Sequence, residues 1–198
     1  MQLNKQLANL PVYQPGRPLG EVGRELGLPL ESLIKLASNE TPLGPSPKAI
    51  EAMNQTAKQA HLYPDGNAFY LRNAVAKKLG VTKEQLIFGN GSNEIIEFVA
   101  HALLAPGTNI VVSQYCFAIY PIVAHLAGAD CITVPAKNYG HDLLAMCEAI
   151  TDQTRIVFVA NPNNPTGAVY DKALLQEVVE VAREHGLVVF SDEIYDKI

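Results

Sequence analysis

Short apolar runs alternate with longer segments of helical periodicity along most of the chain. The apolar runs, rich in β-branched residues, predict buried strands at residues 86–88, 110–112, 131–134, 156–159 and 187–190. Apolar positions that recur every three or four residues predict helices at residues 92–104, 117–127, 142–150 and 171–184. Strands and helices that alternate in this way indicate an α/β fold, with a mainly parallel sheet covered by helices on both faces.

The N-terminal part of the chain has a different pattern. Residues 1–45 contain many prolines and glycines around one short predicted helix at residues 19–26. We interpret residues 1–45 as an extended arm and residues 46–198 as the domain that carries the sheet.

Two further helices are expected at the start of that domain. Ser46 and Pro47 are typical of an N-cap and a first helical position, and this helix should run to about residue 60. Asn67 is expected to cap the next helix, which Gly80 should end.

Composition and charge exclude several classes of protein. Of the 198 residues, 48% are hydrophobic and 18% are charged, which is typical of a globular enzyme. A net charge of -5 argues against binding to nucleic acid or to an acidic membrane surface. The chain has neither a signal peptide nor a run long enough to span a bilayer, so we expect a soluble protein.

Cysteines and histidines indicate no metal site. The three cysteines form no CxxC motif, so neither a disulfide framework nor a thiolate metal site is suggested, and a reduced, cytoplasmic setting fits best. The five histidines also lack the spacing of metal ligands.

Polar loops follow the strands of the predicted sheet. In a parallel sheet the carboxyl ends of the strands lie at one edge, where open α/β folds bind their ligands. Four loops fall at that edge, and together they predict a single site: GNGSN at residues 89–93, QYCF at 114–117, NPNNPTG at 161–167 and DEIY at 192–195.

Taken singly, these loops leave alternatives open. Residues 89–93 could bind a phosphate at the start of a helix with help from the Ser92 hydroxyl, or could simply form a glycine turn with a capping serine. They match neither a dinucleotide-binding fingerprint nor a Walker P-loop. Asp192 needs a cationic partner or several hydrogen bonds if it is shielded, but it could also be a solvated or helix-capping acid. Phe117 could belong to the core.

Taken together, the loops resemble those of a known enzyme family. NPTG followed by DEIY, with Gly91-Ser92-Asn93 upstream, is similar to the class I/II aminotransferases, pyridoxal-phosphate enzymes of the aspartate aminotransferase fold. The segments KLASNETPLGPSP, LYPDGNAFYLRNAVAKKLGV and IFGNGSNEIIEFVAHALLAPG resemble the histidinol-phosphate aminotransferases within this family. DEIYDKI departs from that group, which more often has DEAY, and looks closer to alanine-type aminotransferases.

The resemblance implies roles for individual residues. Asp192 would pair with the protonated pyridine nitrogen of pyridoxal phosphate and so keep its ring an electron sink. Asn164 and Tyr195 would form hydrogen bonds with the phenolic oxygen of the same ring. Phe117 would stack on the ring, and residues 91–93 would hold the phosphate. The implied cofactor-binding residues are Gly91, Ser92, Asn93, Phe117, Asn164, Asp192, Tyr195 and Tyr63.

The resemblance also implies partners and an incomplete active site. Tyr63 would reach the phosphate from a neighbouring subunit, which implies a homodimer, and Tyr13 and Asn164 would line the substrate pocket; Tyr13 could equally be a surface tyrosine of the arm. The implied reaction is transamination between a small amino donor, histidinol phosphate, and 2-oxoglutarate. The family's Schiff-base lysine would follow residue 198, so residues 46–198 would form a truncated fold type I large domain without the catalytic lysine, inactive alone. The alternatives are an alanine-type aminotransferase, a decarboxylase or a C–S lyase, or a non-catalytic fragment.

Overall fold

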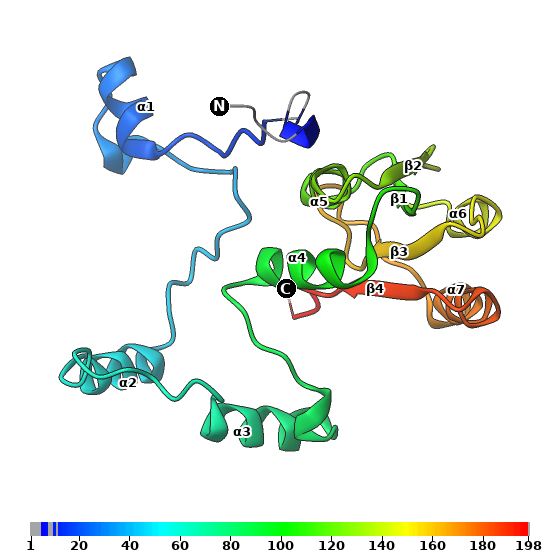
Figure 1. The fold of residues 1–198 in the computed structure, drawn as a ribbon. Helices are drawn as coiled ribbons and strands as arrows, with labels where there is room; N and C mark the ends of the chain where they lie inside the picture. The colour runs from blue at the N-terminus through cyan, green and yellow to red at the C-terminus, as the bar shows by residue number, and fades with distance from the viewer. Residues whose placement is uncertain (1–4, 8–9, 11, 198) are drawn as a thin grey trace. The chain divides into compact units, whose positions relative to one another are not determined.

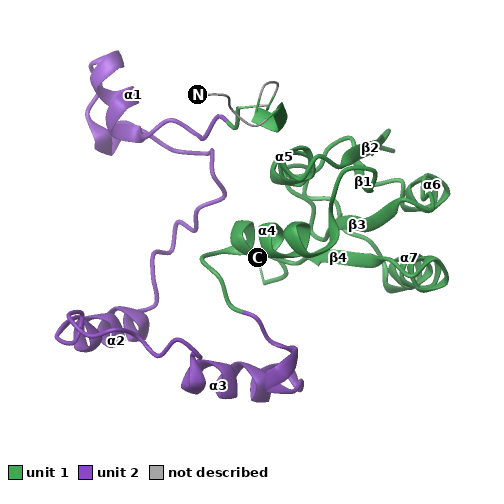
Figure 2. Cartoon of the chain, viewed as in Figure 1, with its two compact units in different colours: residues 1–13, 88–198 green, residues 14–87 purple. Residues whose placement is uncertain are grey.

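The computed structural model describes residues 5–7, 10 and 12–197. The chain forms two compact units, one of Gln14–Ile87 and one of Met1–Tyr13 with Phe88–Ile198 (Figure 2). Residues 1–4, 8, 9 and 11 of the expected arm lie outside the described residues. The expected boundary between an arm and a cofactor domain at residue 45 stays a prediction.

A parallel sheet organises the second unit. Its strands lie in the order β2-β1-β3-β4, and each neighbouring pair is parallel, as the sequence predicted. The strand bounds are β1 Asn109–Ser113, β2 Asp130–Val134, β3 Thr154–Ala160 and β4 Val188–Asp192. Asp192 is therefore the last residue of a strand and not the first residue of the loop that follows it.

The helices lie close to their predicted positions. In the sheet unit they are α4 Ser92–Leu103, α5 Ile119–Leu126, α6 Leu143–Glu148 and α7 Lys172–His185. In the other unit they are α1 Leu19–Leu26, α2 Pro47–Ala57 and α3 Phe69–Leu79, with short 3-10 turns at Leu30–Ser32 and Lys83–Gln85. A further 3-10 turn, Lys5–Leu7, belongs to the sheet unit. Within the described part of the chain, every helix is too short or too polar to cross a bilayer.

Helices cover both faces of the sheet (Figure 1). Successive strand residues point to opposite faces, so Ile110 and Phe158 pack beneath α4 and α5. Val111 and Val157 face the other way, toward α6 and α7. All four side chains are at most 1% exposed, and burying each contributes about 1.5–3 kcal/mol. The continuous apolar runs of the sequence are the consequence of this burial on two sides.

The order in which the chain adds strands to the sheet reverses between β1 and β3. From β1 it passes through α5 to β2, whereas from β3 it passes through α7 to β4 on the opposite side. Right-handed crossovers in opposite directions place their helices on opposite faces, which is the arrangement seen in Figure 1. Ligands of open α/β sheets bind outside the carboxyl ends of the strands at such a switch point.

The strand predicted at residues 86–88 was wrong. The Leu86 carbonyl, which a strand neighbour would need, accepts a hydrogen bond from the Arg72 guanidinium, and the Leu86 N–H closes a turn onto the Lys83 carbonyl. Ile87 is 62% exposed. An apolar run becomes a strand only where it forms a ladder with a neighbouring strand, and residues 86–88 are not part of a strand in the described structure.

The helix caps of the first unit differ in part from expectation. Ser46 precedes α2, but its side chain makes no capping hydrogen bond. Asp65, and not Asn67, caps α3, because its carboxylate accepts from the backbone N–H of Phe69 at 2.7 Å and of Asn67 at 3.0 Å. Gly80 ends α3 in the left-handed conformation, as predicted.

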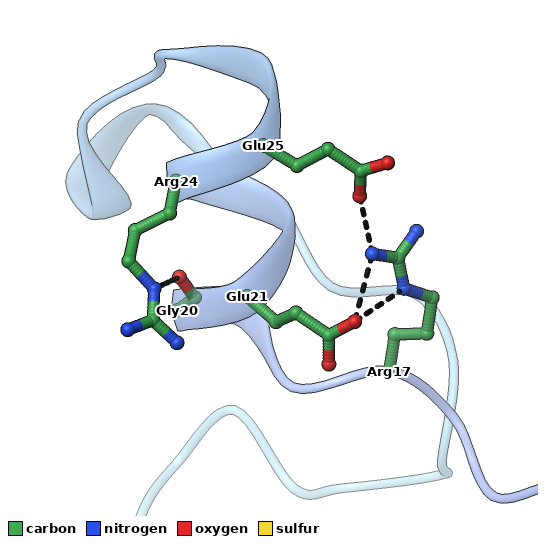
Figure 3. A network of polar contacts seen from close by, with 5 residues as sticks. All are labelled: Arg17, Gly20, Glu21, Arg24 and Glu25. Atoms are coloured by element: carbon green, nitrogen blue, oxygen red, sulfur yellow. Dashed lines mark hydrogen bonds and ion pairs between the residues drawn. The ribbon is translucent and has the colours of Figure 1, made fainter.

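Charged side chains surround the N-terminal turns of α1 (Figure 3). Arg17 precedes the helix, and its guanidinium bonds the carboxylates of Glu21 and Glu25. Arg24 donates to the Gly20 carbonyl at 3.1 Å. Because these groups are exposed, the network orders the start of α1 without adding much stability.

Candidate functional site

Three loops meet at the carboxyl edge of the sheet. They follow β1, β3 and β4, and they carry most of the polar residues that the sequence singled out. Ala160 and Asp192 are direct partners at the ends of β3 and β4, and the Asn161 N–H donates to the Asp192 carbonyl at 2.9 Å. The parallel register therefore places the NPNNPTG loop beside Asp192.

Asp192 has a partner that the sequence analysis did not identify. The Tyr120 hydroxyl donates to Asp192 Oδ2 at 2.6 Å. Tyr120 is 1% exposed, and its ring stacks on Phe158 with centroids 4.3 Å apart. Burial foremost, and then the bond to Asp192, raises the pKa of Tyr120 far above its usual value, so the phenol remains a proton donor. Asp192 is thus a partly buried acid held by a hydrogen bond, not a solvated one.

Asn164 and Tyr195, two residues for which the resemblance implied a cofactor contact, lie close together. The Asn164 side-chain amide lies 3.4 Å from the Tyr195 hydroxyl, which is a long and weak hydrogen bond. Both side chains are half-buried, and they come from the loops after β3 and β4. The loops after β3 and β4 therefore bring two polar side chains into contact with each other.

Asn163 is a second residue that the sequence analysis missed. Its side chain is 3% exposed, and its amide nitrogen donates to the Tyr115 carbonyl at 2.8 Å and to the Thr166 hydroxyl at 2.9 Å. Asn163 therefore links the loop after β3 to the loop after β1. Its place among the three asparagines of NPNN, residues 161–164, was the signal available, but any of them could have been the buried one.

Phe117 lies at the edge of the core. It is half-buried, packs against the cluster beneath α4 and α5, and meets the Tyr120 ring edge-on with centroids 5.8 Å apart. Tyr120 therefore contacts both Phe117 and Asp192, and all three belong to one group of side chains at the carboxyl edge.

The glycine loop leads into the N-terminus of α4. Gly91 has φ 80° and ψ 176°, and no side chain caps the helix. The Glu94 carboxylate accepts from the Asn90 backbone N–H at 2.6 Å and from the Asn90 amide at 3.1 Å. Ser92 is half-buried and Asn93 is exposed. The first N–H groups of a twelve-residue helix are therefore presented as the sequence suggested, with an acid in the first turn that the sequence analysis did not weigh.

Tyr13 and Tyr63 have no demonstrated place in this group. Tyr13 is 51% exposed. Tyr63 belongs to the unit of Gln14–Ile87, and its side chain is fully exposed. The roles implied for them stay predictions.

Thiol and metal chemistry find no support at this edge. Burial foremost raises the pKa of Cys116 to about 12, so this thiol is a poor nucleophile. Across residues 5–7, 10 and 12–197, no cluster of three His, Cys, Asp or Glu side chains could hold a metal ion.

The donor set at the edge fits pyridoxal 5'-phosphate. Asp192 Oδ2 is taken by Tyr120, whereas Oδ1 accepts a 3.4 Å contact from the Ile194 N–H and has capacity for a ring N–H. Asn164 and Tyr195 offer donors to an anionic oxygen, and the N-terminus of α4 offers backbone N–H groups to a phosphate.

Comparison with known proteins supports this chemistry. The family model for class I and II aminotransferases matches residues 31–198. The chain is 51% identical over 183 residues to histidinol-phosphate aminotransferase 2 of Pseudomonas fluorescens, covering 92% of this chain and 49% of that protein. The chain spans about half the length of the curated relatives it matches.

Solved structures share the fold. Histidinol-phosphate aminotransferase from Sinorhizobium meliloti, in complex with pyridoxal-5'-phosphate, aligns with a TM-score of 0.83 at 22% identity, over 98% of this chain and 51% of that one. Alanine aminotransferase from Pyrococcus furiosus aligns with a TM-score of 0.80 at 26% identity, over 100% of this chain and 53% of that one. The sheet and its helices thus form part of an aspartate-aminotransferase-like, fold type I domain. By sequence and fold, the chain belongs to the class I and II aminotransferases.

Proposed function

We propose that the protein containing this chain is a pyridoxal 5'-phosphate-dependent aminotransferase, and that this chain supplies most of its cofactor-binding residues. The observation that carries the proposal is the buried hydrogen bond from Tyr120 to Asp192 at the switch point, beside Asn164 and Tyr195. A carboxylate held at Oδ2 in this way has Oδ1 left to accept a hydrogen bond from a ring N–H.

Each group at the edge has a part in holding the cofactor. Asp192 Oδ1 would accept a hydrogen bond from the protonated ring nitrogen. Asn164 and Tyr195 would donate hydrogen bonds to the phenolic oxygen. Phe117 would cover one ring face and exclude water from it. The backbone of residues 91–93 and the Ser92 hydroxyl would bind the phosphate at the N-terminus of α4.

The cofactor, when bound, supplies an electron sink for the bond that breaks at the substrate's α-carbon. The chain's residues keep that sink effective, since Asp192 holds a proton at the ring nitrogen while Asn164 and Tyr195 stabilise negative charge on the phenolic oxygen. The lysine that carries the cofactor and moves the α-proton is assigned to the part of the protein outside this chain, because the relatives are about twice as long. Lys197 is not assigned this role: it is 85% exposed and pairs with Asp196.

Histidinol phosphate is the proposed amino donor and 2-oxoglutarate the proposed acceptor. The names and the high identity of the relatives support this choice. A homodimer, in which Tyr63 reaches the phosphate of the neighbouring subunit, and a cytoplasmic location belong to the same proposal. The DEIYDKI segment and the Pyrococcus furiosus structure favour an alanine-type aminotransferase as the second candidate.

A donor comparison with the complete protein tests the proposal. Glutamate formation from 2-oxoglutarate is measured with histidinol phosphate and with L-alanine as donor, for the wild type and for Asp192→Ala. We expect kcat/KM to favour histidinol phosphate by about 100-fold or more, because a site built to bind the phosphate of its substrate would leave its polar groups unpaired when alanine is bound. A preference for alanine would establish the second candidate, and an Asp192→Ala variant with wild-type activity would contradict the assignment of the site.

The isolated 198-residue chain provides a further check. We expect no turnover from it, because the covalent lysine is proposed to lie in the remainder of the protein. Turnover by the isolated chain that Asp192→Ala abolishes would show that this expectation is wrong.

A further inference from the structure

Tyr120 joins the core of the sheet unit to its carboxyl edge. Its ring lies within the apolar cluster beneath α4 and α5, stacked on Phe158 with an interplanar angle of 12°. Its hydroxyl leaves that cluster and donates to Asp192 Oδ2 at 2.6 Å. The side chain therefore crosses from the rigid interior to the acid at the end of β4.

The hydroxyl has no role in packing. A buried phenol costs free energy unless its O–H finds an acceptor, and a phenylalanine would fill the same volume beside Phe158 without that cost. The acceptor here is a carboxylate, so the bond is charge-assisted and stronger than one between neutral groups. The presence of tyrosine at this position is therefore explained by what its hydroxyl does to Asp192.

The geometry has one direct effect on Asp192. With Oδ2 fixed by a donor anchored in the core, the carboxylate cannot rotate freely, and Oδ1 keeps a constant direction. A ring N–H placed opposite Oδ1 would therefore keep its hydrogen-bond acceptor in line.

We propose that Tyr120 is a positioning residue, which orients Asp192 so that Oδ1 stays aimed at the protonated ring nitrogen of the cofactor. This inference rests on the proposed function, because it needs Asp192 to be the partner of that nitrogen. Tyr120 itself touches neither the cofactor nor the substrate and acts through Asp192.

Removal of the hydroxyl from the complete enzyme tests the proposal. Tyr120→Phe keeps the ring and its stacking, and Tyr139→Phe is the control, because Tyr139 is 73% exposed in the loop between β2 and α6. Each variant is loaded with pyridoxal 5'-phosphate labelled with ¹⁵N at the ring. For Tyr120→Phe we expect the ¹⁵N shift to move toward that of the neutral ring, and the cofactor dissociation constant to rise about tenfold. The control should match the wild type in both measurements.

A double-mutant cycle distinguishes positioning from a general loss of structure. In the Asp192→Asn background, Tyr120→Phe should change the dissociation constant less than about twofold, because the carboxylate through which it acts is already gone. Equal losses in both backgrounds would mean that the hydroxyl only supports the fold. A wild-type ¹⁵N shift in Tyr120→Phe would overturn the inference about Tyr120 but leave the proposed function standing. A wild-type ¹⁵N shift in Asp192→Asn would overturn the proposed function itself.

Discussion

Asn163 spans the switch point of the sheet with a 2.8 Å hydrogen bond from its side-chain amide to the backbone carbonyl of Tyr115. The two residues are 48 positions apart in the sequence. Asn164 follows the donor directly, and Phe117 lies two residues after the acceptor. The bond therefore sets the relative positions of two residues that are proposed to hold the cofactor from different sides.

Replacing Asn163 with alanine should loosen both loops. The change removes two hydrogen bonds donated by the side-chain amide, one of them to the Tyr115 carbonyl, which costs about 1–3 kcal/mol. Urea unfolding of the complete protein measures this loss, and cofactor affinity should fall with it. Asn73→Ala is the matched control on the exposed face of α3 and should change stability by less than about 0.5 kcal/mol. Equal stability of the two variants would contradict the proposed link between the loops.

Gly91 should tolerate no side chain. Its φ of 80° and ψ of 176° belong to a region that only glycine occupies readily, so Gly91→Ala should cost about 1–3 kcal/mol. The strain falls on the turn that presents the N-terminus of α4, so the dissociation constant of pyridoxal 5'-phosphate should also rise. Gly20→Ala in α1, where a methyl group meets nothing within 4 Å, should be neutral or slightly stabilising. Unchanged cofactor affinity in Gly91→Ala would separate this turn from the phosphate site.

Asp65 should make the stability of α3 depend on pH. Hydrogen bonds from the backbone N–H groups of Phe69 and Asn67 lower the pKa of this carboxyl in the folded chain. The stabilising contribution of Asp65 is therefore present at pH values above the pKa that this carboxyl has in the unfolded chain. It is lost as the pH falls through the lower pKa that the carboxyl has in the folded chain. Amide hydrogen exchange in α3 should show less protection in acid for the wild type, and low protection at every pH for Asp65→Ala. Asn67→Ala should leave the protection of α3 unchanged, because the Asn67 side chain does not cap the helix.

His141 should destabilise the protein as the solution becomes acidic. Its ring is 6% exposed and stacks on Tyr170, and burial lowers its pKa to about 4 against the weaker opposing effect of the Ala160 carbonyl. The unfolded chain binds a proton at this histidine from about pH 6.5 downward, whereas the folded chain does so only near pH 4. Stability should therefore fall across this window, by at most about 3 kcal/mol.

Unfolding in urea at pH 7 and at pH 5 measures that effect. His141→Phe keeps a ring against Tyr170 and should reduce the difference between the two pH values. His101→Gln, at an exposed position of α4, should leave the difference as it is in the wild type. The same pH difference in His141→Phe as in the wild type would assign it to other groups.

The sequence determined the architecture because local patterns encode it. Continuous apolar runs between helical segments predicted the parallel sheet with both faces covered, and loops at strand ends predicted the edge that holds Asp192, Asn164 and Tyr195. Where a feature depended on a partner distant in the chain, local pattern was insufficient. Residues 86–88 have the apolar character of a strand, but no neighbouring strand pairs with them in the described structure.

Tertiary structure alone decided which side chains hold the site in place. Tyr120 and Asp192 are 72 residues apart, and only the fold brings the Tyr120 hydroxyl to the end of β4. Asn163 was one of three similar asparagines until the turn buried it beneath Tyr115. Hydrogen bonds of this kind form between elements that the sheet brings together, so the residues that make them carry no periodicity or spacing by which the sequence could reveal them.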